Sequence, residues 1–89
     1  MNKINNPKDI LSYLTDIDNE YNSTRNESQK NRIEDRARIF LNSIDDGIYL
    51  KLNNGKASGL CSPSFFQSDL DYCIVNLDRM IKGQPIMDF

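Results

Sequence analysis

Histidine and tryptophan are absent from the 89 residues of the chain, and alanine occurs only twice. Without histidine the chain lacks the commonest general acid/base of enzymes, the base of Ser–His and Cys–His nucleophile pairs, and a usual zinc ligand. We therefore expect no enzymatic activity, no bound metal and no cofactor. Asparagine (11 residues) and isoleucine (10) are abundant instead, a bias expected of AT-rich genomes such as those of many phages and mobile elements.

Long apolar runs are missing as well. No stretch approaches the roughly 18–20 consecutive apolar residues of a membrane span, and the polar segment 1–6 has no apolar core of a signal peptide. We therefore expect a cytoplasmic protein. In that compartment Cys61 and Cys73, which form no CxxC pair, are expected to be reduced and buried thiols, with a disulfide as the alternative.

Neither sign of charge is in large excess, since 13 acidic residues oppose 11 basic ones and the net charge is −2. Nucleic-acid-binding proteins usually have a clear basic excess, so we do not expect this partner. Ile, Leu, Val and Phe number 23 of the 89 residues, which is enough for a chain of this length to form a core. The sequence therefore predicts a single small domain over residues 1–89.

Two segments in the first half have the apolar spacing of amphipathic helices. The first, 7–22, follows Asn6-Pro7, an N-cap with proline at the first helical position. The second is predicted over 25–45, with a start near Ser28 as the alternative, and with Gly47 at the left-handed C′ position. Together they predict an antiparallel helical hairpin.

The second half is predicted to contain a β-hairpin and a third helix. Apolar residues alternate over 48–53, and Asn54-Gly55 favours a type I′ turn, so 48–53 and 56–61 are the predicted strands. A helix follows over 63–82, and residues 83–89 form an apolar tail that is either ordered or mobile. The predicted fold class is α+β, mainly α, in the order α-α-β-β-α.

The helix at 25–45 carries three arginines along one flank, Arg25, Arg32 and Arg36. Guanidinium groups in a row can bind phosphate or carboxylate, so one hypothesis is an anion site. The corresponding flank of the first helix carries three acids, Asp9, Asp16 and Glu20. The alternative is therefore a salt-bridge ladder, in which a turn at 22–23 places Glu20 level with Arg25 and Asp9 level with Arg36.

The helix at 63–82 has a second row of candidate residues. Phe65, Tyr72 and Arg79 recur every seven residues, away from the main apolar face, and Val75 lies near them. Aromatic residues and arginine are typical of binding hot spots. The tail extends this row through Met87 and Phe89. The alternative is that this helix is the central one, and that the row is part of the core.

These features favour a non-enzymatic interaction module. A small acidic protein with one aromatic face has the profile of stoichiometric inhibitors, among them phage anti-defence proteins and immunity proteins. It would bind a protein partner, or a second copy, through the row on helix 63–82. The alternative function is an oligomeric binder of an anionic small ligand, such as a nucleotide, through Arg25, Arg32 and Arg36.

Overall fold

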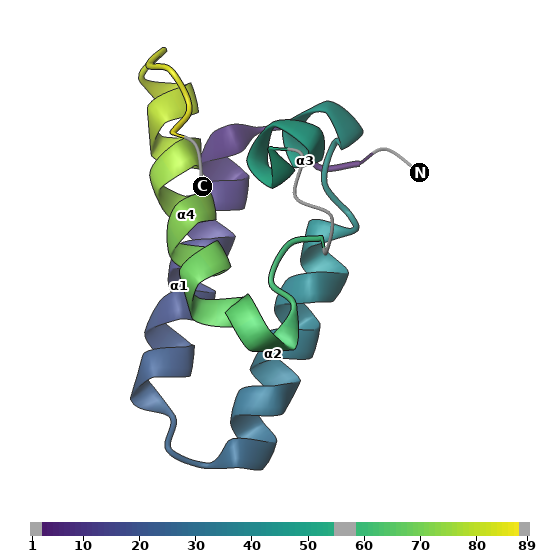
Figure 1. The fold of residues 1–89 in the computed structure, drawn as a ribbon, viewed down its shortest axis with the longest axis vertical. Coiled ribbons are helices and arrows are strands. Elements are labelled where there is room, and N and C mark those ends of the chain that lie inside the picture. The colour runs from purple at the N-terminus through teal and green to yellow at the C-terminus, as the bar shows by residue number, and fades with distance from the viewer. Residues whose placement is uncertain (1–2, 55–58, 88–89) are drawn as a thin grey trace.

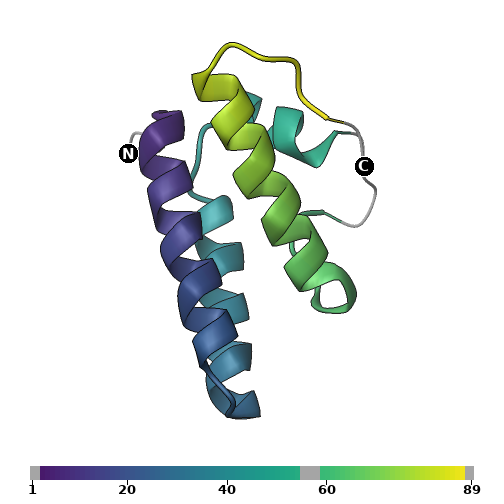
Figure 2. The same cartoon turned by 90° about the vertical axis from the view of Figure 1, so that its left-hand side faces the viewer.

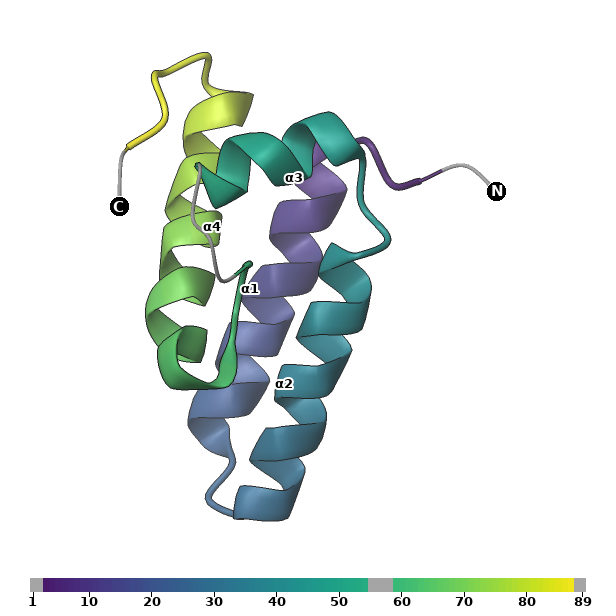
Figure 3. The ribbon, with the colours of Figure 1, turned by 45° about the vertical axis from the view of Figure 1, so that its right-hand side comes forward.

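A computed structural model describes residues 3–54 and 59–87 of the chain. Its helices, with one short 3-10 turn before the last, are α1 (Pro7–Ser23), α2 (Glu27–Leu41), α3 (Asp46–Asn53), η1 (Pro63–Phe65) and α4 (Phe66–Ile81). α1 lies between α2 and α4, and α3 crosses one end of the group (Figures 1 and 3). The described part of the chain contains no strand, so the predicted α+β class is wrong and the architecture is all-helical.

The first helix begins as the sequence predicts. The Asn6 side chain accepts a hydrogen bond from the backbone N–H of Lys8 (2.9 Å), and Pro7 occupies the first helical position. Such a cap satisfies one of the N–H groups that the start of a helix leaves without an intrahelical partner. α1 ends at Ser23, one residue beyond the predicted boundary.

The start of α2 agrees with the alternative prediction near Ser28 and lies two residues after position 25. The helix begins at Glu27, because Asn26 is its N-cap and accepts a hydrogen bond from the backbone N–H of Gln29 (3.2 Å). Asparagine is among the best residues for this position.

The end of α2 also comes earlier than predicted, at Leu41 instead of residue 45. The N-terminal segment binds the backbone that follows the helix. The Ile4 N–H donates to the Ser43 carbonyl (3.1 Å), and the Asp45 N–H donates to the Ile4 carbonyl (2.7 Å). These hydrogen bonds hold residues 43–45 outside the helix and leave Asp45 free to start the next one.

Residues 48–53, the first predicted strand, lie in α3. The Asp45 carboxylate caps this helix by accepting a hydrogen bond from the Ile48 N–H (3.1 Å). Ile48 and Leu52, four residues apart, both pack into the core, whereas Leu50 is 68% exposed. A strand would have placed Leu50 on the same face as its two neighbours, so the segment follows the helical period.

Gly47 and Asn54, which were predicted to end a helix and to form the hairpin turn, both belong to α3 or its cap. Gly47, predicted at C′ of the second helix, lies in the first turn of α3. Asn54 has the left-handed backbone (φ 48°, ψ 42°) that a type I′ turn needs, but it forms the C-cap of α3. Gly55 and the first half of the second predicted strand, 56–61, lie outside the described residues, and residues 59–61 form no strand.

The core is built around α1, not around the helix at 63–82 as one alternative proposed. Its apolar stripe packs against both neighbouring helices. The side chains that fill the core from these three helices include Ile10, Leu14, Ile17, Ile33, Ala37, Leu41, Leu70, Cys73 and Leu77. α4 therefore needs only one of its sides for the core, and its other side is available for a site.

Cys61 and Cys73 are both buried and form no disulfide bond, as predicted. Over the described ranges, the chain contains no helix that is both long and apolar enough to cross a membrane.

Candidate functional site

The C-terminal tail, residues 84–87, turns back beside α4 on the side away from α1 (Figure 2). Side chains of α4 and of this tail line a groove. We call it the α4 groove. Its volume is about 300 Å³, and its lining residues are Ser68, Asp71, Tyr72, Val75, Asn76 and Met87. A single helix has a convex surface, so the groove depends on the return of the tail beside the helix.

The turn after α4 brings the tail back. Gly83 has a left-handed backbone (φ 71°), its N–H donates to the Met80 carbonyl (3.2 Å), and the Gln84 N–H donates to the Arg79 carbonyl (2.8 Å). This pair of hydrogen bonds is a Schellman motif, which ends a helix and reverses the chain. The predicted stop at Gly83 is confirmed.

Asn76 holds the tail in place from inside the fold. Its side chain is fully buried, its Oδ1 accepts from the Met87 N–H (2.9 Å), and its Nδ2 donates to the Met87 carbonyl (3.2 Å). The Arg79 guanidinium adds a hydrogen bond to the Pro85 carbonyl (3.1 Å). Three side-chain hydrogen bonds therefore fix the position of Met87 at the edge of the α4 groove.

Asn76 was not among the predicted site residues, although the sequence contains a signal for it. Asn76 lies between Cys73 and Leu77 on the apolar flank of the helix. A buried amide needs hydrogen-bond partners, and inside a helix the backbone offers it few. A polar residue on an apolar flank therefore indicates a partner from another segment, which here is the tail.

The structure brings together only part of the predicted row. Tyr72, Val75 and Met87 meet in the α4 groove. Phe65 lies in the 3-10 turn before α4, 52% exposed and outside the groove lining. The Arg79 side chain is half-buried and binds the tail. Phe89 lies outside the described residues.

Among the described residues, the lining of the α4 groove has one ionisable group besides Tyr72, the carboxylate of Asp71. Asp71 accepts a hydrogen bond from Gln67 Nε2 (2.8 Å), which also donates to Asp18 of α1 (2.9 Å). The groove is thus an apolar surface with a carboxylate at its edge. This combination suits a partner that offers an apolar side chain next to a hydrogen-bond donor or a positive charge.

The arginine flank of α2 is not a single site. Arg36 forms an ion pair with Glu20 (Nη2–Oε2 2.6 Å), and this hydrogen bond raises the pKa of the Arg36 guanidinium. Arg25 and Arg32 are exposed, and neither forms an ion pair with any residue of the described ranges.

The register between α1 and α2 explains why the predicted pairs do not form. Glu20 lies level with Arg36, not with Arg25, and the rings of Tyr13 and Phe40 stack (centroids 3.8 Å apart) further from the connection between the two helices. The three-residue connection between the helices, 24–26, shifts α2 relative to a turn at 22–23. The ladder is therefore reduced to a single pair.

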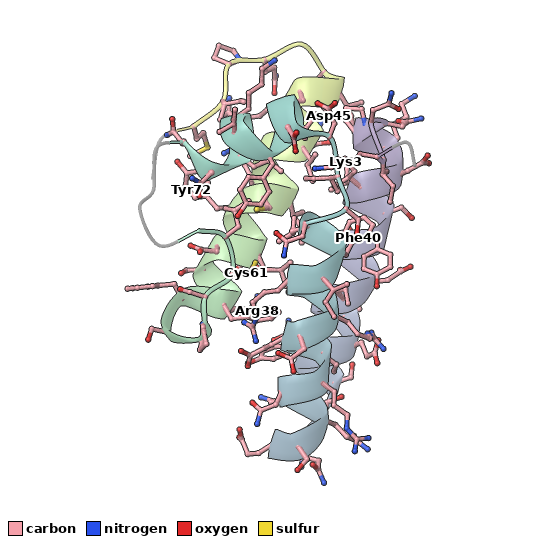
Figure 4. All side chains as sticks on the ribbon, turned by 90° about the vertical axis from the view of Figure 1, so that its right-hand side faces the viewer. Lys3, Arg38, Phe40, Asp45, Cys61 and Tyr72 are labelled. Carbon is pink, nitrogen blue, oxygen red and sulfur yellow. The ribbon has the colours of Figure 1, made fainter. Side chains whose placement is uncertain are left out.

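A second polar cluster, which the sequence did not predict, joins four segments of the fold. Arg38 of α2 points toward the segment at Cys61 (Figure 4) and donates to the Cys61 carbonyl (2.6 Å), and the buried Asp69 carboxylate accepts from the Cys61 N–H (2.9 Å). Glu34 lies beside Arg38 and accepts from the Tyr21 hydroxyl (3.1 Å). These contacts position the segment before α4.

Burial raises the pKa of the Tyr21 phenol, and the hydrogen bond to Glu34 raises it further. The Lys30 ammonium lies over the Tyr21 ring, 4.9 Å from its centre. Each member of the cluster forms a hydrogen bond or an ion pair with another member, so we assign the cluster a structural purpose.

No protein-family model matches the chain, and neither a curated protein nor a solved structure is significantly similar to it. Within residues 3–54 and 59–87, no group of three or more Cys, Asp or Glu side chains is arranged to hold a metal ion.

Proposed function

We propose that the protein is a non-enzymatic, cytoplasmic interaction module that binds a protein partner through the α4 groove. The observation that carries this proposal is the meeting of Tyr72 and Val75 from α4 with Met87 from the tail. Aromatic residues and methionine are enriched at the centres of protein interfaces. A module of this kind acts by covering a surface of its partner, as stoichiometric inhibitors do.

The exposure of the apolar side chains also supports a protein partner. Val75 is 45% exposed and Met87 44%, so the α4 groove is open to solvent, and Phe65 in the 3-10 turn before α4 is a further exposed apolar side chain (52%). Its volume of about 300 Å³ is at the lower limit of small-molecule pockets, which range from about 300 to 1,000 Å³. One or two side chains from a partner fill such a groove, whereas a nucleotide-sized ligand would leave much of its surface exposed.

The alternative function, an anionic ligand bound by Arg25, Arg32 and Arg36, has less support. A ligand that uses all three arginines must displace Glu20 from Arg36. A thermal-shift screen with nucleotides tests this alternative, because binding to the folded state at millimolar ligand raises the melting temperature. A shift that Arg32→Gln removes would favour the anion site over the α4 groove.

The proposal is tested by affinity capture with two matched variants. Val75→Lys places a charge in the α4 groove, and Ile39→Lys makes the same kind of change at a 68% exposed position on α2. We expect a stoichiometric partner to be retained by the wild-type protein and by Ile39→Lys, and lost by Val75→Lys. Circular dichroism checks that both variants remain folded. Equal capture by all three proteins would show that the partner binds elsewhere.

A further inference from the structure

We propose that the occupant of the α4 groove is α4 of a second copy of this chain, packed antiparallel across a two-fold axis near Val75. This inference depends on the proposed function, since it names the partner of the same surface. It is carried by two observations: the arrangement of the side-chain rows around the groove, and the distribution of charge on those rows.

Two rows of side chains at a spacing of four residues border the groove on α4. One row is Ser68, Tyr72 and Asn76, and the other is Asp71 and Val75, which continues along the helix to Arg79 beyond the groove lining. Rows of this spacing are the ridges that pack into the grooves of a facing helix, at a crossing angle of about −50° in the commonest class. The Asp71 row of each copy can therefore lie in the α4 groove of the other copy.

The charges on the Asp71 row are complementary to themselves under a two-fold axis. Asp71 precedes Val75 by four residues and Arg79 follows it by four, which is about 6 Å along the helix axis in each direction. In an antiparallel pair centred on Val75, Asp71 of each copy lies level with Arg79 of the other. A two-fold interface repeats every contact, so the opposite charges meet twice.

Both charged groups are available for this pairing. Within the described part of the chain, neither Asp71 nor Arg79 forms an ion pair. Asp71 accepts a hydrogen bond from Gln67, and Arg79 uses one N–H on the Pro85 carbonyl. A guanidinium has five N–H donors, so Arg79 can bind the tail and the partner's carboxylate together.

The apolar residues lie where a stable interface needs them. Val75 is at the proposed axis, with Tyr72 and Met87 beside it, and Asp71 and Arg79 lie at a greater distance along the helix. An apolar centre with a charged rim is the usual anatomy of a protein interface. The surface is small, so we expect a dissociation constant in the micromolar range, about 1–100 μM.

Charge exchange combined with analytical ultracentrifugation tests the geometry. Asp71→Arg and Arg79→Asp each replace two attractive contacts by two repulsive ones, and we expect each to weaken the dimer by about tenfold or more. The double variant Asp71→Arg/Arg79→Asp restores opposite charges at both contacts and is expected to dimerise more tightly than either single variant, although it lacks the hydrogen bond from Arg79 to the Pro85 carbonyl. Asp16→Arg, an equal change of charge at an exposed position on α1, is the control and should not change dimerisation.

The outcomes separate this inference from the proposed function. A wild-type protein that is monomeric up to about 500 μM overturns the self-association. A dimer that the double variant does not restore overturns the antiparallel geometry. A monomer that still captures a different protein, in a manner that Val75→Lys abolishes, leaves the α4 groove as a docking site and overturns only the identity of its occupant.

Discussion

Replacing Asn76 by leucine tests how the site is built. The side chains have similar size, so the change removes the two hydrogen bonds to Met87 (2.9 and 3.2 Å) without opening a large cavity. A typical hydrogen bond contributes about 1 kcal/mol net, so the tail loses about 2 kcal/mol of attachment. Since 1.36 kcal/mol is a factor of ten, the ratio of attached to detached tail falls by about 30-fold.

Amide hydrogen exchange measured by NMR provides the assay. In Asn76→Leu the Met87 amide is expected to exchange up to about 30 times faster, while the amides of the buried part of α4, such as Leu77, keep their protection. Asn31→Leu, at an exposed position on α2, is the matched control and should leave both rates unchanged. A change of less than about threefold at Met87 in Asn76→Leu would refute the assignment of Asn76 as the residue that holds the tail.

Three further predictions concern the elements around the site. Asp45→Ala removes the N-cap of α3 (3.1 Å to the Ile48 N–H) and is expected to lower the free energy of unfolding, measured by urea denaturation, by about 1 kcal/mol. Asp46→Ala is the control and should lower it by less, because its ion pair with Lys3 is exposed. An equal loss in the two variants would contradict the cap. Gly83→Ala puts a side chain at φ 71°, where nothing lies within 4 Å of the added Cβ. The expected loss of about 1 kcal/mol in stability therefore arises from the backbone alone, and it should lower the melting temperature by roughly 4–8 °C. An unchanged melting temperature would argue against the left-handed turn. The pKa of Tyr21 is raised from its usual value of 10.0 in the folded protein, so the folded state retains the phenolic proton more firmly than the unfolded chain and stability falls as the pH rises through 10. Urea denaturation between about pH 8 and pH 11 should show a smaller fall for Tyr21→Phe, and identical slopes for the two proteins would exclude this linkage.

The helix ends that the sequence predicted correctly depend on local chemistry. Asn6 caps a backbone N–H two residues away, and Gly83 supplies a left-handed backbone at the end of α4. Both arrangements involve only a few consecutive residues, so they can be recognised without knowledge of the fold. The end of α2 could not be recognised in this way, because Ile4 binds the backbone of residues 43–45 from a distant part of the sequence.

The error over residues 48–53 has a different cause. In a segment this short, apolar residues at positions 48, 50 and 52 fit a strand, and those at 48 and 52 fit a helix equally well. The Asp45 cap decides in favour of the helix, and Asn54 uses its left-handed conformation to end it. Asp45 was predicted to be the last residue of the preceding helix, so its role as the N-cap of α3 was not recognised.

The part of the site that depends on local helix geometry was predictable, and the part that depends on contacts between distant segments was not. The spacing along the helix was enough to place Tyr72 and Val75 on one side of α4, because helical geometry is local. The partner segment was not predictable in this way, because the return of Met87 depends on the buried amide of Asn76. α4 alone offers a convex row of side chains, and only the attached tail turns this row into a groove. Asn76→Leu should therefore weaken docking at the α4 groove as well as free the tail, although the Asn76 side chain is itself fully buried.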